Sequence, residues 1–448
     1  MKVRCPIHGL VEYNDVEEQV LNCGVMQRLR EIHQLGMAYL VYPGAVHTRF
    51  DHSLGVMHVA GRIAQSLRLR REQIENVRLA ALLHDVGHGP FSHVSEMPLE
   101  ILSAAYVHRK GMETEKLHEC ITVDIINHDR ELGRVLGSRR QEIVALIETA
   151  NHPIRTAARD IISGPLDADK LDYLLRDSYF CGVKYGVYDL DRVINGVVKI
   201  GAGEESFVGV KLDSLWAVEQ HLMARYHMTI QVYRHRVRRS TDMLLARAIL
   251  LAAEEGAGEI AKVYAYRGPK ASFSSRWLRY TDNRLLDAIT QQAPRSRAGR
   301  LLSAIRSRAL SFEVLSVPLK QLPTLYRGKI ADRGEQQELE AQIAKDCSMD
   351  RDRVIVDVVR TEPPRPSSSE PAIDPEEILV DGGRGGPSRF HEVSDIFTEN
   401  PLKGRDLVTF YAPLTGKRKS DREKERKRLR PLVKEVIERR TKEVRSGR

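Results

Sequence analysis

The segment ALLHDVGHGPFSH constrains this chain most, because an apolar helix ends there in two adjacent polar residues and is broken at once by glycine. His84 and Asp85 follow the apolar residues, and Gly87 and Gly89 come next. An imidazole and a carboxylate side by side at a helix end can both turn toward one point. Together they suit divalent ions such as Mn, Fe, Zn or Mg, so the pair predicts a metal site without fixing the metal.

Two further segments contain residues of the same kinds. His52 opens an amphipathic helix in HTRFDHSLG, and Asp169 lies in LDADKLDYLLRD. Three helices could therefore converge on one ion. A histidine–aspartate pair taken alone is more often a buried core histidine beside a surface aspartate, and spacing by itself does not decide between the two interpretations.

The rest of the chain predicts a mostly helical protein. Between residues 20 and 180, apolar positions recur every three or four residues in VMQRLREIHQL, SLGVMHVAGRIAQSL, VRLAALLHDV and CITVDIINH. We expect a β-hairpin near 196–212, then one long helix from the Asp213-Ser214 cap to about Glu255, with Trp216 and Tyr226 in the core.

A change of character near residue 350 suggests a second region. DRVIVDVV and DLVTFYAP are typical of strands and flank a Pro- and Gly-rich stretch from Pro363 to Pro387. We therefore predict a helical domain over 1–345, a smaller α+β region over 346–416, and a basic helical or disordered tail over 417–448.

The net charge of +9 is confined to this tail. Residues 417–448 contain 15 Lys and Arg against 6 Asp and Glu, so the preceding residues are neutral overall. Such a tail is usually a solvated helix, and it lacks aromatic residues for stacking on bases. A weak contact with nucleic acid or another polyanion stays open. The alternative is docking through a narrow apolar stripe, formed by Leu429, Leu432, Val433, Val436 and Ile437.

Cysteine usage and hydropathy predict a cytoplasmic protein. The five cysteines are widely spaced and form no CxxC pair, so we expect them to be reduced. No stretch reaches the 18 or more apolar residues of a membrane span, which predicts no membrane contact.

The residues described above resemble the HD-domain phosphohydrolases, whose signature is H…HD…D. QRLREIHQLGMAYLVYPGAVHTRFDHSLGV, LLHDVGHGPFSH and DADKLDYLLRDS are similar to the catalytic domain of the deoxynucleoside triphosphate triphosphohydrolases, and the resemblance extends from about Pro6 to about Tyr411. It implies an HD-type helical core, a homo-oligomer, and hydrolysis of dNTPs to deoxynucleoside and triphosphate by water attack on the α-phosphorus. The implied ligands of a divalent metal ion are His52, His84, Asp85 and Asp169.

The resemblance also implies roles for residues around the metal. His93 would donate a proton to the departing 5′ oxygen, with Glu96 and His118 orienting it, although taken alone His93 is a loop histidine. The residues that would hold the phosphates are Arg49, His88, Lys170 and Arg225, and His88 is also grouped with the catalytic residues. Arg225, Thr229 and Tyr233 would share one face of the long helix. The residues that would contact the 3′ hydroxyl or exclude a 2′ hydroxyl are Gln34, Leu35, Tyr173, Asp177 and Tyr233. Without the resemblance, Leu35 and Tyr233 are equally well interpreted as packing residues.

Some positions depart from the family pattern. Asn22 stands where guanine-activated members have a carboxylate, although Gln27 and Arg30 are kept, and an amide oxygen accepts only part of what a carboxylate accepts. Thr229 and Gln231 replace a His and an Arg. Three functions stay open: a dNTP triphosphohydrolase, another HD enzyme acting on a phosphomonoester or cyclic dinucleotide, and a nucleic-acid-binding protein with an inactive HD fold.

Overall fold

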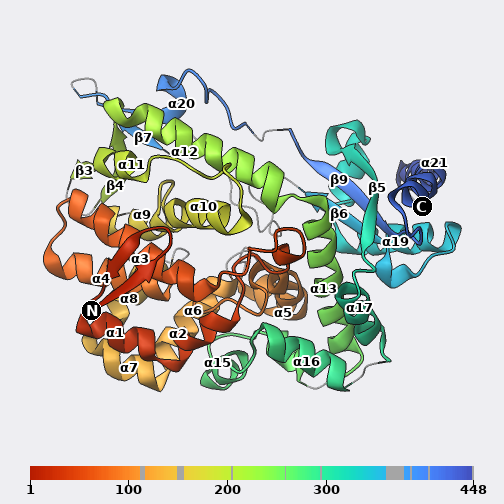
Figure 1. Cartoon of the computed structure of the whole chain (residues 1–448), viewed down its shortest axis with the longest axis horizontal. Coiled ribbons are helices and arrows are strands. Elements are labelled where there is room, and N and C mark those ends of the chain that lie inside the picture. The colour runs from red at the N-terminus through yellow and green to blue at the C-terminus, as the bar shows by residue number, and fades with distance from the viewer. Residues whose placement is uncertain are drawn as a thin grey trace. The chain divides into compact units, whose positions relative to one another are not determined.

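The computed structural model of the chain describes residues 1–110, 117–148, 156–202, 205–257, 259–292, 295–359, 378–383, 386–401 and 404–445. It confirms a mostly helical fold with small sheets (Figure 1). Among the described residues, no helix is long and apolar enough to span a membrane. Much of the predicted stretch Pro363 to Pro387 lies outside the described residues.

The chain forms two compact units and passes between them more than once. Unit 1 comprises Met1–Val232, Val263–Leu285 and Ile373–Pro401, and unit 2 comprises Tyr233–Lys262, Leu286–Ala372 and Leu402–Arg448. This division follows packing, whereas the predicted boundaries at 345 and 416 follow the sequence. Those boundaries stay a prediction.

Unit 1 is built around three helices, α3 (Arg49–Ser66), α4 (Arg71–Leu83) and α10 (Ala168–Cys181). Helix α3 packs against both of the others (Figure 1). Two of its faces are therefore covered, and most of its residues are buried. The other helices within unit 1 are α1 (Asp15–Asn22), α2 (Gly24–Arg28), α5 (Glu96–Lys110), α6 (Leu117–His128), α7 (Arg130–Leu136), α8 (Arg140–Ile147), α9 (Ala157–Ser163), α11 (Leu190–Gly196), α12 (Leu215–Met228), α15 (Ala271–Trp277) and α20 (Phe390–Val393).

The helix predicted in VMQRLREIHQL is shorter than expected. Helix α2 ends at Arg28, a 3-10 turn follows, and Ile32 is extended. The Ile32 carbonyl then accepts a hydrogen bond from the Arg49 amide at 2.9 Å. The chain leaves the helical conformation here because this stretch pairs with the start of α3, which brings Gln34 and Leu35 close to the N-terminus of α3.

The predicted hairpin forms in unit 1 and is joined by strands that the sequence did not indicate. Strand β3 (Val197–Ala202) pairs antiparallel with β4 (Glu205–Lys211), with Val197 opposite Val210. Strand β7 (Leu379–Asp381) adds to β4 in parallel, and β8 (Pro387–Arg389) completes the sheet. A separate hairpin pairs β1 (Lys2–Cys5) with β2 (Gly9–Glu12).

The prediction of a single long helix after Ser214 is wrong. Helix α12 ends at Met228, a π-helical turn spans Thr229–Tyr233, and α13 begins at Arg236. The Thr229 hydroxyl donates to the Arg225 carbonyl at 2.9 Å, a contact that bends helices. The regular face predicted for Arg225, Thr229 and Tyr233 is therefore interrupted.

The prediction that Trp216 is a core residue is also wrong, because its side chain is 71% exposed. It shares an outward face of α12 with Gln220, whereas Leu215, Val218 and Leu222 are buried. Tyr226 is partly buried.

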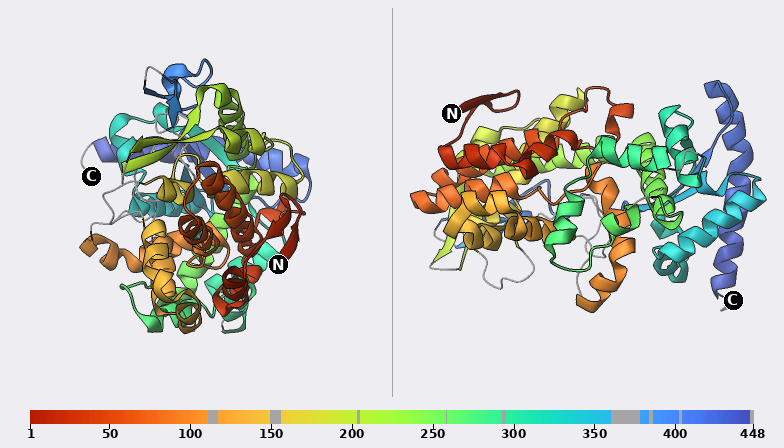
Figure 2. Two further views of the ribbon diagram at one scale, coloured as in Figure 1. Left: turned by 90° about the vertical axis from the view of Figure 1, so that its left-hand side faces the viewer. Right: turned by 90° about the horizontal axis from the view of Figure 1, so that it is seen from below.

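Unit 2 contains the predicted strand pair. Strand β9 (Leu407–Pro413) lies between β6 (Ile355–Val359) and β5 (Ser311–Pro318), antiparallel to both, with Val356 opposite Phe410. The predicted tail is helix α21 (Lys419–Arg445), which contacts β5 and α19 (Arg333–Asp346) (Figure 2). The other helices of this unit are α13 (Arg236–Glu254), α17 (Arg297–Arg306) and α18 (Thr324–Lys329), while α14 (Ile260–Tyr264) and α16 (Asp282–Gln292) pass between the units.

Candidate metal centre

His52 is placed by the capped start of α3. Thr48 and Asp51 form a reciprocal capping box, in which the Thr48 side chain accepts from the Asp51 amide and the Asp51 carboxylate accepts from the Thr48 amide. Such a box satisfies two free amides and fixes the first turn. His52 lies in this turn and is fully buried.

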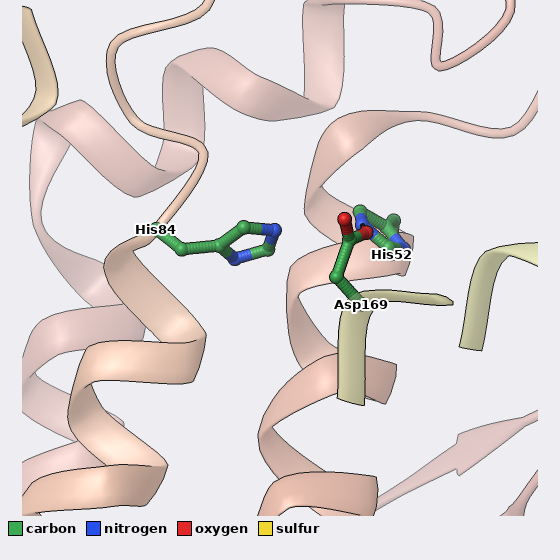
Figure 3. Close-up of side chains that lie close together, drawn as sticks. All are labelled: His52, His84 and Asp169. Atoms are coloured by element: carbon green, nitrogen blue, oxygen red, sulfur yellow. Dashed lines mark ion pairs between the residues drawn. The ribbon is translucent and has the colours of Figure 1, made fainter. Parts of the chain in front are cut away.

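Two other helix ends bring their polar residues to the same place. Helix α4 ends just before His84 and Asp85, and α10 begins at Ala168 with Asp167 as its N-cap. Figure 3 shows the side chains of His52, His84 and Asp169 pointing toward one another from three separate elements. Their candidate ligand atoms all lie within 4.8 Å of one another.

The four predicted metal ligands therefore meet. The Nε2 atom of His52 lies 2.9 Å from Oδ1 of Asp169 and 3.7 Å from Oδ2 of Asp85. The Nε2 atom of His84 lies 3.2 Å from Oδ1 of Asp85.

The hydrogen bonds of the ring nitrogens of His52 and His84 indicate whether a metal ion fits. His52 Nδ1 is held by Asp172 at 2.8 Å, and His84 Nδ1 by the Ala81 carbonyl at 2.7 Å. Both contacts need a hydrogen on Nδ1, which leaves the Nε2 lone pair for a metal. Among the described residues, neither buried Nε2 atom has a hydrogen-bond partner. The residues present fit a divalent ion.

The carboxylates of the centre are ionised. Burial opposes the charge on Asp85, but Arg49, His84 and His88 hold its pKa well below the usual range. Burial also opposes the charge on Asp169, whose pKa is lowered by the nearby ring of His52. Burial alone would lower the pKa of His52, but Asp169 and Asp172 raise it to about 10. The same negative field would favour a divalent cation in competition with this proton.

The loop after Asp85 is held close to α6. The Gly87 amide donates to the Thr122 hydroxyl at 3.0 Å, and Trp277 Nε1 donates to the Gly87 carbonyl at 2.9 Å. A Cβ atom at Gly87 would lie 2.3 Å from the His118 carbonyl oxygen, so glycine permits this approach.

The predicted acid–base residues form a group beside the centre. His93 Nδ1 contacts Glu96 Oε1 at 2.8 Å, and Arg49 Nη2 lies 3.4 Å from His93 Nε2. Burial alone would raise the pKa of Glu96, but His93, His118 and His88 lower it to about 2. The rings of His88 and His118 are stacked with centroids 4.3 Å apart. Burial, Arg49 and His118 hold the pKa of His88 well below its usual value.

The predicted phosphate-binding residues already have protein partners. Arg49 contacts Asp85 through Nη1 at 2.6 Å and Ser92 through Nε at 2.9 Å. Lys170 Nζ donates to the Gly164 carbonyl at 2.9 Å and contacts Asp167. Arg225 is buried in unit 1.

Four of the predicted sugar-contacting residues are buried in unit 1: Gln34, Leu35, Tyr173 and Asp177. Asp177 Oδ1 contacts His47 Nε2 at 2.8 Å. Tyr233 belongs to unit 2, so its place beside a sugar stays a prediction.

The two residues that keep the family pattern near Asn22 make local contacts. Gln27 donates to the Leu21 carbonyl at 2.7 Å, and Arg30 Nε donates to Gln27 Oε1 at 2.9 Å. Asn22 is exposed at the end of α1.

Sequence reasoning missed three residues that support the site. Asp172 contacts His52, His8 contacts Asp172 at 2.6 Å, and His47 contacts Asp177. Each lies in a segment that already carried the resemblance. For Asp172 the signal was spacing, since it lies three residues after Asp169 on the same helix and shares its face.

Comparisons with known proteins bear on this site. The HD domain family model matches residues 49–177, and the HD associated region matches residues 189–379. The first match includes all four predicted metal ligands.

Individual relatives extend the similarity. An uncharacterised protein of Methanocaldococcus jannaschii is 33% identical over 290 residues, which cover 65% of this chain and 57% of that protein. A protein of Dictyostelium discoideum, named as a deoxynucleoside triphosphate triphosphohydrolase homologue, is 31% identical over 256 residues, covering 54% of this chain and 47% of its own length. The chain thus spans about half the length of the curated relatives it matches.

A solved structure matches almost the whole chain. The hypothetical protein from Aquifex aeolicus superposes with a TM-score of 0.68 at 26% sequence identity, covering 97% of this chain and 99% of that one.

Proposed function

Since the chain is an HD-domain protein with an HD associated region, we propose that it is a metal-dependent phosphohydrolase whose preferred substrates are deoxynucleoside triphosphates. The observation that carries the proposal is the pair of buried Nε2 atoms on His52 and His84, which lie beside two ionised carboxylates and have no hydrogen-bond partner among the described residues. We propose His52, His84, Asp85 and Asp169 as the ligands of a divalent ion, with Mn, Fe, Mg and Zn as the candidates.

A divalent ion bound there supplies positive charge for the phosphate and lowers the pKa of water that it coordinates. Protein side chains would hold the remaining phosphate oxygens of the substrate. Arg49 lies between Asp85 and His93, which suits a guanidinium that contacts a phosphate oxygen next to the reacting bond. Lys170, Arg225 and His88 are the further residues that we propose to bind phosphate.

His93 is the proposed general acid. Its Nδ1 atom is held by Glu96, so Nε2 is the nitrogen that would protonate the leaving 5′ oxygen, and its side chain is 39% exposed. We propose that His118 helps Glu96 to orient this ring.

Selection for deoxyribose is assigned to Gln34, Leu35, Tyr173, Asp177 and Tyr233. The support is the resemblance together with the named Dictyostelium relative, which is 31% identical to this chain. We also propose that the protein acts as a homo-oligomer, which its mass in solution would test.

The test is incubation with dNTPs, NTPs and cyclic dinucleotides in the presence of Mn²⁺ or Mg²⁺, with Asp85→Ala as the inactive control. We expect deoxynucleoside and intact triphosphate from dNTPs. Stepwise release of orthophosphate, or cleavage of cyclic dinucleotides only, would indicate another HD phosphohydrolase activity. Nucleic-acid binding without any hydrolysis would indicate an inactive HD fold.

A further inference from the structure

Two consecutive residues directly before His93 have a left-handed backbone. Phe91 has a φ of 58° and a ψ of 25°, and Ser92 has a φ of 55°. Residues other than glycine rarely adopt this conformation, and a bulky residue such as Phe91 is a clear outlier. Such strain persists only where the surroundings hold the backbone in place. The turn therefore depends on contacts from the rest of the protein.

A segment from much later in the chain holds the loop that contains this turn. Unit 1 takes up Val263–Leu285 as a separate stretch. The side chains of this stretch that contact the loop are Tyr264, Trp277 and Asp282. The Tyr264 hydroxyl lies 2.8 Å from the Ser95 hydroxyl, and the Phe91 amide donates to Oδ1 of Asp282 at 2.5 Å. Asp282 thus contacts the left-handed turn directly.

Asp282 holds a second segment with its other oxygen. Oδ2 accepts from the His33 amide at 3.0 Å and lies 2.7 Å from His33 Nδ1, which carries the hydrogen because a carboxylate only accepts. The Ser92 hydroxyl donates to the His33 carbonyl at 2.6 Å. The Asp282 side chain is 3% exposed, so water competes little with these contacts. One buried carboxylate therefore joins the left-handed turn to the segment that leads into Gln34 and Leu35.

The turn that Asp282 holds is connected to residues of the proposed reaction. His93 follows it directly in the chain, and the Ser92 hydroxyl accepts from Arg49 Nε at 2.9 Å. Arg49 has another anchor in Asp85, at 2.6 Å. His93 depends more on the turn, because its own backbone continues from it. A change in the turn should therefore displace His93 more than Arg49.

We infer that Asp282 is a positioning residue of the proposed reaction, and that it acts on the general acid His93 by holding the turn Phe91–Ser92 in its left-handed conformation. The inference rests on the proposed function and adds to it a residue that acts through another side chain. A misplacement of about 1 Å can reduce the rate of an enzymatic step by about 100-fold. The loss of Asp282 should therefore lower kcat. KM should change little, because Arg49 and Lys170 keep their own contacts.

The test replaces Asp282 with Asn, which keeps the size of the side chain but has one acceptor oxygen instead of two. The amide oxygen is best placed toward the two donors of His33, so its NH₂ group faces the Phe91 amide and the contact with the turn is lost. We expect kcat for dNTP hydrolysis to fall by about 10- to 100-fold. Asp160→Asn is the matched control and should keep kcat, since Asp160 is another buried carboxylate of unit 1 and accepts from the Val208 amide at 2.9 Å.

A double-mutant cycle separates positioning from a general loss of stability. If Asp282 acts through His93, Asp282→Asn should have no further effect on kcat in a His93→Ala protein, because the group that it positions is absent. Equal fold losses in the two backgrounds would overturn the inference. If Asp282→Asn does not fold, Asp282→Glu keeps both acceptor oxygens but moves them by one methylene group. It should show the same dependence on His93, and a wild-type kcat in this variant would equally refute the positioning role.

Hydrogen exchange measured by mass spectrometry follows the turn independently of hydrolysis. In Asp282→Asn the Phe91 amide should exchange about 10- to 100-fold faster, which corresponds to one hydrogen bond to a charged group. Asp160→Asn should leave this amide unchanged. Unchanged exchange in Asp282→Asn would contradict the inference, whether or not the protein hydrolyses dNTPs. Faster exchange together with a wild type that hydrolyses no dNTP would contradict only the proposed function.

Discussion

Asp172 links a metal-ligand candidate to the N-terminal hairpin. Its carboxylate is fully buried and contacts His52 Nδ1, His8 Nε2 and the Arg176 guanidinium. Burial opposes its charge, but Arg176, His52 and His8 hold its pKa well below the usual range. A charged acceptor at this position fixes the ring of His52 and makes its Nε2 atom a better ligand.

We therefore predict that Asp172→Asn weakens binding of a divalent ion at the proposed centre by about 10- to 100-fold, the usual effect of losing such a partner. Competition with a chromophoric chelator measures the dissociation constant. Asp124→Asn is the control, because Asp124 is another buried carboxylate of unit 1 whose partners include Lys270 and Ser274. Equal affinities in the wild type and Asp172→Asn would refute this role.

His221 should make the stability of unit 1 depend on pH. It is fully buried on α12, and neither ring nitrogen has a hydrogen-bond partner among the described residues. Burial lowers its pKa to about 3, assisted by Arg225 and Lys170. The unfolded chain takes up this proton below about pH 6.5, whereas the folded chain does not until about pH 3. Its contribution is thus present above pH 6.5 and is lost as pH falls toward 3.

We predict that His221→Leu reduces the loss of stability between pH 6 and pH 4, by up to about 1.4 kcal/mol for each pH unit. Urea unfolding at several pH values measures the free energy of unfolding of both proteins. Tryptophan fluorescence is a suitable probe, because Trp216 and Trp277 are the two tryptophans and both belong to unit 1. The same pH dependence in both proteins would show that His221 is already charged when folded.

At the scale of elements, a glycine determines how closely α3 and α10 can pack. A Cβ atom at Gly55 would lie 2.0 Å from Oδ1 of Asp172 and 2.2 Å from Nη2 of Arg176. These two side chains hold each other and are fully buried, so neither can move away easily. The approach that presents Asp172 to His52 therefore depends on the missing side chain.

Gly55→Ala should destabilise unit 1 by about 1–3 kcal/mol through overpacking, despite the better helix propensity of alanine. Gly328→Ala is the matched control, since it is also a helical glycine but has nothing within 4 Å of the added Cβ atom. We expect it to be neutral or to stabilise by up to about 1 kcal/mol. Thermal unfolding followed by circular dichroism compares the unfolding temperatures of the two variants. If both temperatures change in the same direction, the close packing at Gly55 is not the cause.

Elements were predictable from the sequence where local pattern and packing agree. The strands around Val356 and Phe410 and the helices of the HD segment follow their periodicity. The π turn at Thr229 was not predictable, because it depends on a hydroxyl contact within an otherwise regular helical pattern. The HD pair and its distant partners were recognisable as ligand types, whereas the contacts of His8 and His47 depend on segments more than 100 residues away.

At the scale of the whole molecule, the basic tail is part of a core. In unit 2 the buried residues of α21 pack in the same cluster as Val356 and Phe410. These residues of α21 are Leu429, Val433, Val436 and Ile437. Arg440 adds ion pairs to Glu335 at 2.8 Å and 2.9 Å. The apolar stripe of α21 therefore packs on the rest of unit 2, as the docking interpretation predicts. Leu432 is the member of the stripe that stays 37% exposed.

We predict that Leu429→Ala destabilises unit 2 by about 2–5 kcal/mol, because it removes a buried side chain. Leu432→Ala on the same helix is the control and should change stability by less than about 0.5 kcal/mol. Urea unfolding followed by circular dichroism reports both units, whereas tryptophan fluorescence reports unit 1. Equal effects of the two substitutions on the circular dichroism transition would contradict this packing.

Because α21 completes a core, deleting residues 417–448 cannot test whether its cations bind a polyanion, and point substitutions are needed. Lys424, Lys427 and Lys434 are exposed on α21. If they contact a phosphate backbone, replacing all three with Gln should reduce the dependence of single-stranded RNA affinity on salt by about 0.7 for each lost contact, on logarithmic axes. The control replaces three exposed lysines of unit 1: Lys184, Lys199 and Lys211. Fluorescence anisotropy with a labelled single-stranded RNA at several salt concentrations measures both slopes. A slope that falls only in the α21 variant would support a polyanion-binding face, and equal slopes would show that the charge of this helix serves only to keep its outer side in water.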